Sequence, residues 1–192
     1  GGADDDGFSG ERTVNLNDFH DNLDAVANAT LGDFDGDGDA DIAALISETG
    51  DDEPGRLVWY ENTAGSWRKE EIDDKVIQFA PFNVAYLIVA EVNGDGNPDL
   101  VFHTASGGLA WSENRLDDGS GFTEYKLIHD DPDIAGLHAA DLDNDGDTDL
   151  VSGGVNQVAT DGVDTENEIG WYRNDGSGNF EELPIWPHVP GY

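Results

Sequence analysis

The sequence of 192 residues predicts an all-β fold built from three four-stranded antiparallel units. Three observations support this fold class. An acidic segment of ten residues occurs three times, beginning at Asp33, Glu91 and Asp141. Short apolar runs of the kind that form buried strands flank each copy. A tryptophan-containing segment and then a glycine-rich turn follow each copy.

Each acidic segment has the side-chain pattern of a calcium loop. Oxygen-bearing side chains occupy positions 1, 3, 5 and 9, and position 6 is Gly38, Gly96 or Gly146. Ca²⁺ prefers roughly six to eight oxygen ligands, and alternate side chains of a tight loop converge on one point. The alternative, an ordinary hairpin turn, needs one Asp-Gly pair and not four or five acids that repel one another. Glu91 and Asn93 leave the middle loop with fewer charges than the other two.

These loops differ from those of EF-hands. An EF-hand has a bidentate Glu at position 12 and a helix on each side. Position 12 is instead Ala44, Phe102 or Ser152, and the flanking apolar runs are short enough to be strands. We therefore expect each loop to join two strands of a β-hairpin.

The other strands of each unit are predicted from shared segments. The first strands lie around residues 25–34, 86–92 and 137–142, the third strands over 57–62, 109–114 and 169–174, and the fourth strands start at Trp67, Phe122 and Phe180. Four-stranded units that repeat at the spacing of these three acidic segments are typical of β-propeller blades. The tryptophan of each third strand is predicted to pack between blades, with a sugar-binding platform as the alternative.

The predicted domain organisation has five parts. They are an N-terminal extension with one outer strand (1–23), three blades (24–75, 76–130 and 131–186) and a C-terminal tail (187–192). Closed propellers have about 4–8 blades, so three blades leave two flanks open. Residues 8–16 resemble a fourth strand that has no blade of its own. They fit either a domain cut within a blade or a strand donated to a neighbouring subunit.

The acidic loop and the segment Trp-Tyr-x-Asn-Asp-Gly-x-Gly-x-Phe together resemble the FG-GAP/VCBS repeat family, which includes the integrin alpha-subunit propeller. The resemblance covers about residues 24–186 and is fullest over 141–180; it departs from the family pattern at residues 62–67 and in the ligands of the middle loop. It implies three Ca²⁺ ions, held by the side chains at positions 1, 3, 5 and 9 and the main-chain carbonyl at position 7. Carried over residue by residue, the ligands are Asp33, Asp35, Asp37, Asp39, Asp41, Glu91, Asn93, Asp95, Asn97, Asp99, Asp141, Asp143, Asp145, Asp147 and Asp149.

The amino-acid composition excludes several classes of partner and function. Asp and Glu number 43 against 8 Lys and Arg, a formal net charge of −35, which argues against nucleic acid or an anionic membrane as the main partner. The chain has no Cys and no apolar run long enough to span a membrane. The five histidines form no catalytic motif with Ser or Asp. We therefore expect a non-enzymatic, secreted chain that is extracellular or at the cell surface.

Two classes of function fit these features. The first is a calcium-binding structural protein whose blades associate with copies of itself, by blade packing and strand addition, in a filament or another assembly. The alternative is a carbohydrate-binding or adhesive module of a larger FG-GAP/VCBS propeller, and an accessory propeller of an enzyme is a weaker third option. Asn28 begins the only Asn-x-Ser/Thr sequon, although its place in a predicted strand disfavours glycosylation.

Overall fold

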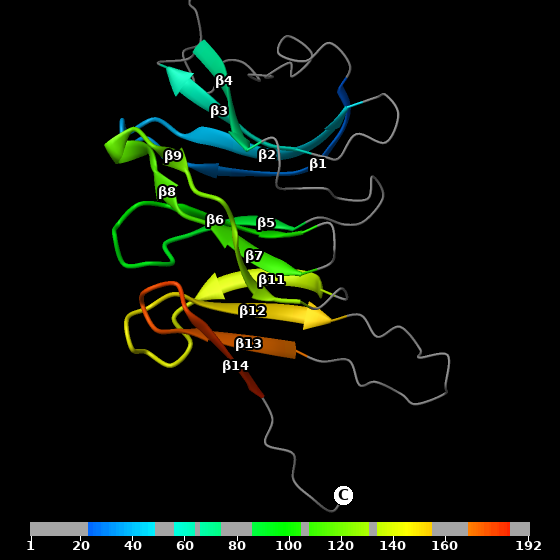
Figure 1. Cartoon of the computed structure of the whole chain (residues 1–192), viewed down its shortest axis with the longest axis vertical. Coiled ribbons are helices and arrows are strands. Elements are labelled where there is room, and N and C mark those ends of the chain that lie inside the picture. Colours follow the sequence, from blue (N-terminus) through cyan, green and yellow to red (C-terminus); the bar gives the residue numbers. More distant parts are fainter. Residues whose placement is uncertain are drawn as a thin grey trace, which may run out of the picture.

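A computed structural model describes residues 23–48, 56–63, 66–73, 86–104, 108–130, 134–154 and 169–184. These residues form three four-stranded antiparallel sheets, one two-stranded ribbon and a 3-10 turn at Leu116–Asp118. The sheets are stacked in chain order along the long axis of the molecule, with the second sheet between the first and the third (Figure 1). The predicted all-β class, with three four-stranded antiparallel sheets, is confirmed.

The first and third sheets have the predicted strand order, and the acidic loop joins the first strand of each sheet to the second. The strands of the first sheet are β1 (Leu23–Gly32), β2 (Asp41–Glu48), β3 (Arg56–Thr63) and β4 (Ser66–Asp73). Those of the third sheet are β11 (Ile134–Ala140), β12 (Asp149–Gly154), β13 (Ile169–Asn174) and β14 (Phe180–Pro184). In both sheets each strand pairs with the next one along the chain.

The second sheet departs from the prediction in its fourth strand. Its strands are β5 (Leu87–Ala90), β6 (Asp99–His103), β7 (Leu109–Ser112) and β10 (Lys126–His129). Phe122 does not start the fourth strand but pairs with Asn114 in the ribbon of β8 (Asn114–Arg115) and β9 (Gly121–Phe122). The reason is the length of the segment between the asparagine and the phenylalanine. Phe122 lies eight positions after Asn114, whereas Phe180 lies six positions after Asn174. The 3-10 turn at Leu116–Asp118 lies in this longer segment.

Charged side chains connect this ribbon to the second sheet. The Glu113 carboxylate accepts a hydrogen bond from Arg115 at 2.8 Å and forms an ion pair with Lys126 at 3.4 Å. The Lys126 ammonium lies 4.3 Å from the centre of the Trp111 ring. The hydrogen bond from Arg115 is the main reason that the pKa of Glu113 lies below its usual value.

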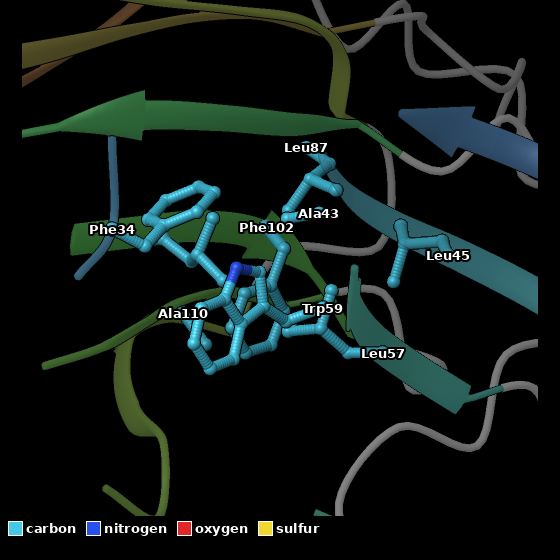
Figure 2. Close-up of a cluster of buried hydrophobic side chains, with 9 residues drawn as sticks. Phe34, Ala43, Leu45, Leu57, Trp59, Leu87, Phe102 and Ala110 are labelled. Carbon is cyan, nitrogen blue, oxygen red and sulfur yellow. The ribbon is translucent and has the colours of Figure 1, made fainter. Parts of the chain in front are cut away.

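The core lies between the sheets. Because successive side chains of a strand point to opposite faces, the second sheet can pack on both of its neighbours. Leu87 and Phe102 pack against Leu57 and Trp59 of the first sheet (Figure 2). On the other face, a second cluster joins the second sheet to the third, with members Val101, Leu109, Trp111, Leu137, Leu150 and Tyr172. The strands β6 and β7 are buried along their whole length for this reason.

The tryptophans of the first two sheets belong to these cores. Trp59 is 6% exposed and Trp111 is 1% exposed, and each faces the next sheet of the stack. The prediction that they pack between sheets is confirmed for these two. Trp171, at the equivalent place in the third sheet, is half-buried.

The two ends of the stack differ. The outer side chains of the first sheet, Ala44, Ile46, Val58 and Tyr60, are fully buried. On the third sheet, Ile169 and Leu142 are exposed. The expectation of two open flanks therefore holds for the third sheet, whereas these four side chains of the first sheet are covered.

Some predicted features lie outside the described residues. They are the strand over residues 8–16, most of the N-terminal extension (1–23) and the tail (187–192). Within the described ranges, the model contains no helix with the length and apolar character needed to cross a bilayer.

Candidate metal centres

The first and third acidic loops each bring three carboxylates together. In the first loop, oxygens of Asp33, Asp35 and Asp37 all lie within 4.8 Å of one another. In the third loop, the equivalent group has the same spacing and consists of Asp141, Asp143 and Asp145. These are positions 1, 3 and 5, as the sequence predicted, and most of these side chains are exposed.

Hydrogen bonds within the loop produce this convergence. The position-3 carboxylate accepts from the main-chain N–H of position 5, at 3.2 Å in both loops. The position-1 carboxylate accepts from the glycine N–H at position 6, at 3.1 Å for Gly38 and Gly146. These glycines have φ values of 94° and 101°, which L side chains rarely adopt. Position 4 also has positive φ, and Asn144 occupies it in the third loop with φ 63°.

The carboxylates of these loops are crowded. Partial burial raises the pKa of Asp35. Loss of hydration, followed by repulsion from Asp145, raises the pKa of Asp143 and Asp147. Three carboxylates with such spacing suit a hard divalent cation, which prefers oxygen ligands and offsets their repulsion. The donor sets of the first and third loops therefore fit Ca²⁺.

The middle loop is held together differently. Glu91 accepts from the main-chain N–H groups of Asn93 at 3.1 Å and Gly94 at 2.7 Å, and so does not reach position 6. The Asn93 amide donates to the Asp95 carboxylate at 3.0 Å. Two of the predicted metal ligands, Asn93 and Asp95, are therefore hydrogen-bonded to each other. This loop satisfies part of its hydrogen-bonding capacity by itself, which agrees with its lower charge.

The aspartates at position 9 lie beneath the loops. Asp41, Asp99 and Asp149 are fully buried, and both oxygens of each accept main-chain hydrogen bonds. The donors are Phe34 and Asn62 for Asp41 (3.2 and 2.8 Å), Val92 and Asn114 for Asp99 (3.0 and 2.8 Å), and Leu142 and Asn174 for Asp149 (3.2 and 2.8 Å). Each aspartate thus connects the start of its loop to the end of the third strand. Direct metal binding by these three residues stays a prediction.

Burial changes the ionisation of Asp41 and Asp99. Desolvation raises the pKa of Asp99 to about 7, although hydrogen bonds from Asn114 and Val92 act in the opposite direction. Desolvation also raises the pKa of Asp41. In the third sheet, the Trp171 indole N–H adds a hydrogen bond to Asp149 at 3.1 Å.

In the second and third sheets, the asparagine three positions after the tryptophan has a role that the sequence did not reveal. The Asn114 side-chain amide donates to the carbonyl of Phe34, in the loop of the preceding sheet, at 2.8 Å. The Asn174 amide donates in the same way to the carbonyl of Val92 at 2.7 Å. Each amide also donates to a carbonyl of its own loop, Pro98 or Thr148. The signal in the sequence was the recurrence of Asn three positions after each tryptophan, at residues 62, 114 and 174.

Residues 91–152, which include the middle and third acidic loops, match the family model described as an FG-GAP-like repeat. The chain carries an FG-GAP-like repeat. The family resemblance drawn from the loop and tryptophan motifs is confirmed. The matched FG-GAP-like segment contains Asp99, Asn114 and Asp149, so it includes two of the buried aspartates and one of the connecting asparagines.

A similar solved structure is a mutant Tc holotoxin pore of Photorhabdus luminescens, with 21% sequence identity and a TM-score of 0.47. The similarity covers 84% of this chain and 7% of that chain, so this chain spans a small part of its length. No curated protein matches the chain in sequence.

The remaining predicted site residues lie at the edges of the acidic loops or in β1. Asp39, Asn97 and Asp147 occupy position 7, and each main-chain N–H donates to the position-5 carboxylate, at 2.8, 2.7 and 3.0 Å. Asn28 lies in β1, where it is half-buried and pairs with Leu45 of β2. Glycosylation of Asn28 stays a prediction.

A cavity of about 390 Å³ lies beside the first loop. Its apolar wall includes Trp59 and Phe122, from the first sheet and from the ribbon of the second. Asp35, Glu61 and Arg68 provide polar groups, and Glu61 and Arg68 form an ion pair at 3.6 Å. The ribbon that the sequence did not predict therefore forms part of this cavity. Its volume lies within the range of small-molecule sites.

Proposed function

We propose that this chain is a non-enzymatic calcium-binding scaffold, in which the three sheets act as propeller-type blades that associate with further copies. The observation that carries the proposal is the loop arrangement: three carboxylates converge on the surface, above a buried aspartate that joins the strands. The following sheet binds the same loop through Asn114 or Asn174. An ion in such a loop would strengthen both the hairpin and the packing of the next sheet.

Ca²⁺ would be held in the first loop by Asp33, Asp35 and Asp37, and in the third loop by their equivalents at 141, 143 and 145. The family resemblance adds the position-7 carbonyl and position 9. The ion would supply positive charge that offsets carboxylate repulsion, together with a cross-link within the loop. The middle loop is the weakest candidate, because Glu91 and Asn93 are engaged in hydrogen bonds within it.

The proposed location is outside the cell or at its surface. Calcium-binding modules of extracellular proteins work with dissociation constants of roughly 10⁻⁴–10⁻³ M, and exposed loops without a deep cage suit that range.

The structural role is also supported by one of the histidines: His129 pairs with Glu182 of the third sheet at 3.1 Å and its ring lies 5.5 Å from that of Tyr172. These contacts connect two sheets.

Calcium titration tests this proposal. We expect isothermal titration calorimetry of the metal-free chain to show calcium binding at the first and third loops, with weaker binding at the middle one. Asp35→Ala and Asp143→Ala should each remove one of the stronger sites. Asp117→Ala is the matched control, because Asp117 is exposed on the 3-10 turn and lies outside the three acidic loops. A chain that retains no calcium after equilibrium dialysis against millimolar Ca²⁺ would contradict the proposal.

The cavity beside the first loop favours a second candidate function, the binding of a neutral monosaccharide unit. The half-buried ring of Phe122, beside carboxylate and guanidinium groups, is suited to a sugar ring and its hydroxyls. We expect saturation-transfer NMR with glucose, galactose and mannose to give a signal from at least one sugar that Arg68→Ala abolishes. Arg115→Ala, at an exposed position outside the cavity, should leave it unchanged. The absence of signal from all three sugars would eliminate this candidate.

A further inference from the structure

The middle acidic loop differs from the other two at positions 1 and 3. Position 3 is Asn93, whereas the other loops have Asp35 and Asp143 there. Gly94 follows Asn93, and the two residues form the only Asn-Gly pair of the chain. Position 1 is Glu91, which is one methylene longer than aspartate. The two differences meet in the structure, because Glu91 accepts a hydrogen bond from the main-chain N–H of Gly94.

An asparagine followed by glycine can lose its side-chain amide without an enzyme, because glycine has no Cβ to hinder attack by its main-chain nitrogen. A bond forms between the Gly94 nitrogen and Cγ of Asn93. The bond from Cγ to Nδ2 breaks, and ammonia leaves with the proton of the Gly94 N–H. Water then adds to Cγ and opens the cyclic imide. This step restores the main-chain peptide and leaves an aspartate at position 93.

Three hydrogen bonds within the loop hold the groups that would react. The Glu91 carboxylate accepts from the Gly94 N–H at 2.7 Å, so a base lies against the attacking nitrogen. The main-chain N–H of Asp95 donates to Oδ1 of Asn93 at 3.2 Å and polarises the carbonyl that is attacked. Nδ2 of Asn93, the leaving nitrogen, donates to the Asp95 carboxylate at 3.0 Å. Nucleophile, carbonyl and leaving group thus each have a partner in the loop.

We propose that the pair Asn93 and Gly94 is a self-modification site, at which deamidation converts Asn93 into aspartate and supplies the position-3 carboxylate that the middle loop lacks. Water can reach the pair, because Gly94 is exposed and Asn93 is half-buried. The product no longer has the amide that donates to Asp95, so both side chains become available to a cation.

The consequence for metal binding rests on the proposed scaffold function. After deamidation, positions 1, 3 and 5 of the middle loop all carry carboxylates, as they do in the two three-carboxylate groups that begin at Asp33 and Asp141. The affinity of such loops for Ca²⁺ depends on the number of charged ligands. Deamidation would therefore convert the weakest candidate metal centre into one with the same set of charges as the other two.

Mass spectrometry of the full chain, incubated in chelator at mildly alkaline pH, tests the reaction. We expect peptides that contain residue 93 to gain the mass difference between an amide and an acid, with fragment ions that locate the gain at Asn93. Glu91→Gln should slow the reaction by about tenfold or more, because glutamine accepts the hydrogen bond but does not take the proton. Asn97 is the internal control, since Pro98 has no main-chain N–H and cannot attack it.

Circular dichroism verifies that the Glu91→Gln variant is folded, and the same fragment ions identify the linkage of the product. An intact Asn93 after the incubation, or a rate that Glu91→Gln leaves unchanged, would overturn the proposal. A product linked only through the side-chain carbon would also overturn it, because the main chain would then be lengthened at position 93 and the loop geometry lost.

Asn93→Asp reproduces the product and tests its effect on metal binding. Both Asn93→Asp and its control Asn97→Asp are made together with Asp35→Ala and Asp143→Ala, so that calorimetry reports on the middle loop. Asn93→Asp should tighten calcium binding by about tenfold. Asn97→Asp adds the same charge at position 7, where the main-chain carbonyl is the expected ligand, and should have a smaller effect.

Equal affinities of the Asn93→Asp and Asn97→Asp chains would overturn the role of position 93 as a ligand. The two proposals fail in different ways. Deamidation in a chain whose loops bind no Ca²⁺ would contradict the scaffold function alone. Calcium binding at the first and third loops, in a chain that keeps Asn93 unchanged, would contradict the self-modification site alone.

Discussion

Replacing Asp99 by alanine should lower the free energy of unfolding by about 2–5 kcal/mol, since two buried main-chain N–H groups then lose their acceptor. These groups belong to Val92 and Asn114, at 3.0 and 2.8 Å from the carboxylate. Asp99 is in the central sheet, where the strand is buried along its length, and water cannot replace the lost oxygens there. Urea denaturation followed by tryptophan fluorescence measures the difference.

The control for this variant is Asp95→Ala, four residues earlier in the same loop and exposed. Both variants are compared in the presence of a chelator, so that calcium binding does not contribute. Asp99→Asn keeps one acceptor oxygen and should lose less stability than Asp99→Ala. If Asp99→Ala were as stable as Asp95→Ala, the buried aspartates would not be what joins the loop to the third strand.

Removing calcium should produce the other large effect, a decrease in melting temperature. When the free Ca²⁺ concentration is roughly 100 times the dissociation constant of a site, binding at that site adds about 2.7 kcal/mol to the free energy of unfolding. For a chain of this size, each kcal/mol corresponds to about 2–4 °C. With the first and third loops filled, we expect a chelator to lower the melting temperature by about 10–20 °C. Differential scanning calorimetry in chelator and in excess Ca²⁺ measures the change.

The matched comparison for calcium removal is the double variant Asp35→Ala with Asp143→Ala. It lacks one carboxylate from each three-carboxylate group, so its melting temperature should respond little to a chelator. Returning Ca²⁺ to the unaltered chain should restore its original value. Identical melting curves with and without chelator, after metal analysis shows the ion gone, would mean that the loops are stable without it.

The sequence predicted those parts of the fold that depend on local pattern. Short apolar runs and recurring segments placed the strands, and the oxygen side chains at alternate positions placed the carboxylate groups at Asp33 and Asp141. The ribbon of the second sheet was not predicted, because Phe122 and Phe180 both follow a Gly-Ser-Gly turn and the distance from the preceding asparagine differs by two residues. A two-residue difference in loop length leaves almost no local signal.

The asparagine contacts were not predictable for a different reason. Phe34 and Asn114 are 80 residues apart in the sequence, and their hydrogen bond exists only once two sheets are stacked. The same holds for the position-9 aspartates. Their spacing suits both a metal ligand and a main-chain acceptor, and the structure shows that Asp99 is buried and accepts two main-chain hydrogen bonds.

The asparagine contacts also give the stack a direction. The acceptor Phe34 lies between Asp33 and Asp35, whereas the donor belongs to the following sheet. An ion bound in one loop would therefore be coupled to the docking of the sheet that comes after it. Because such coupling is reciprocal, the docking of that later sheet would strengthen ion binding in the preceding loop by the same free energy.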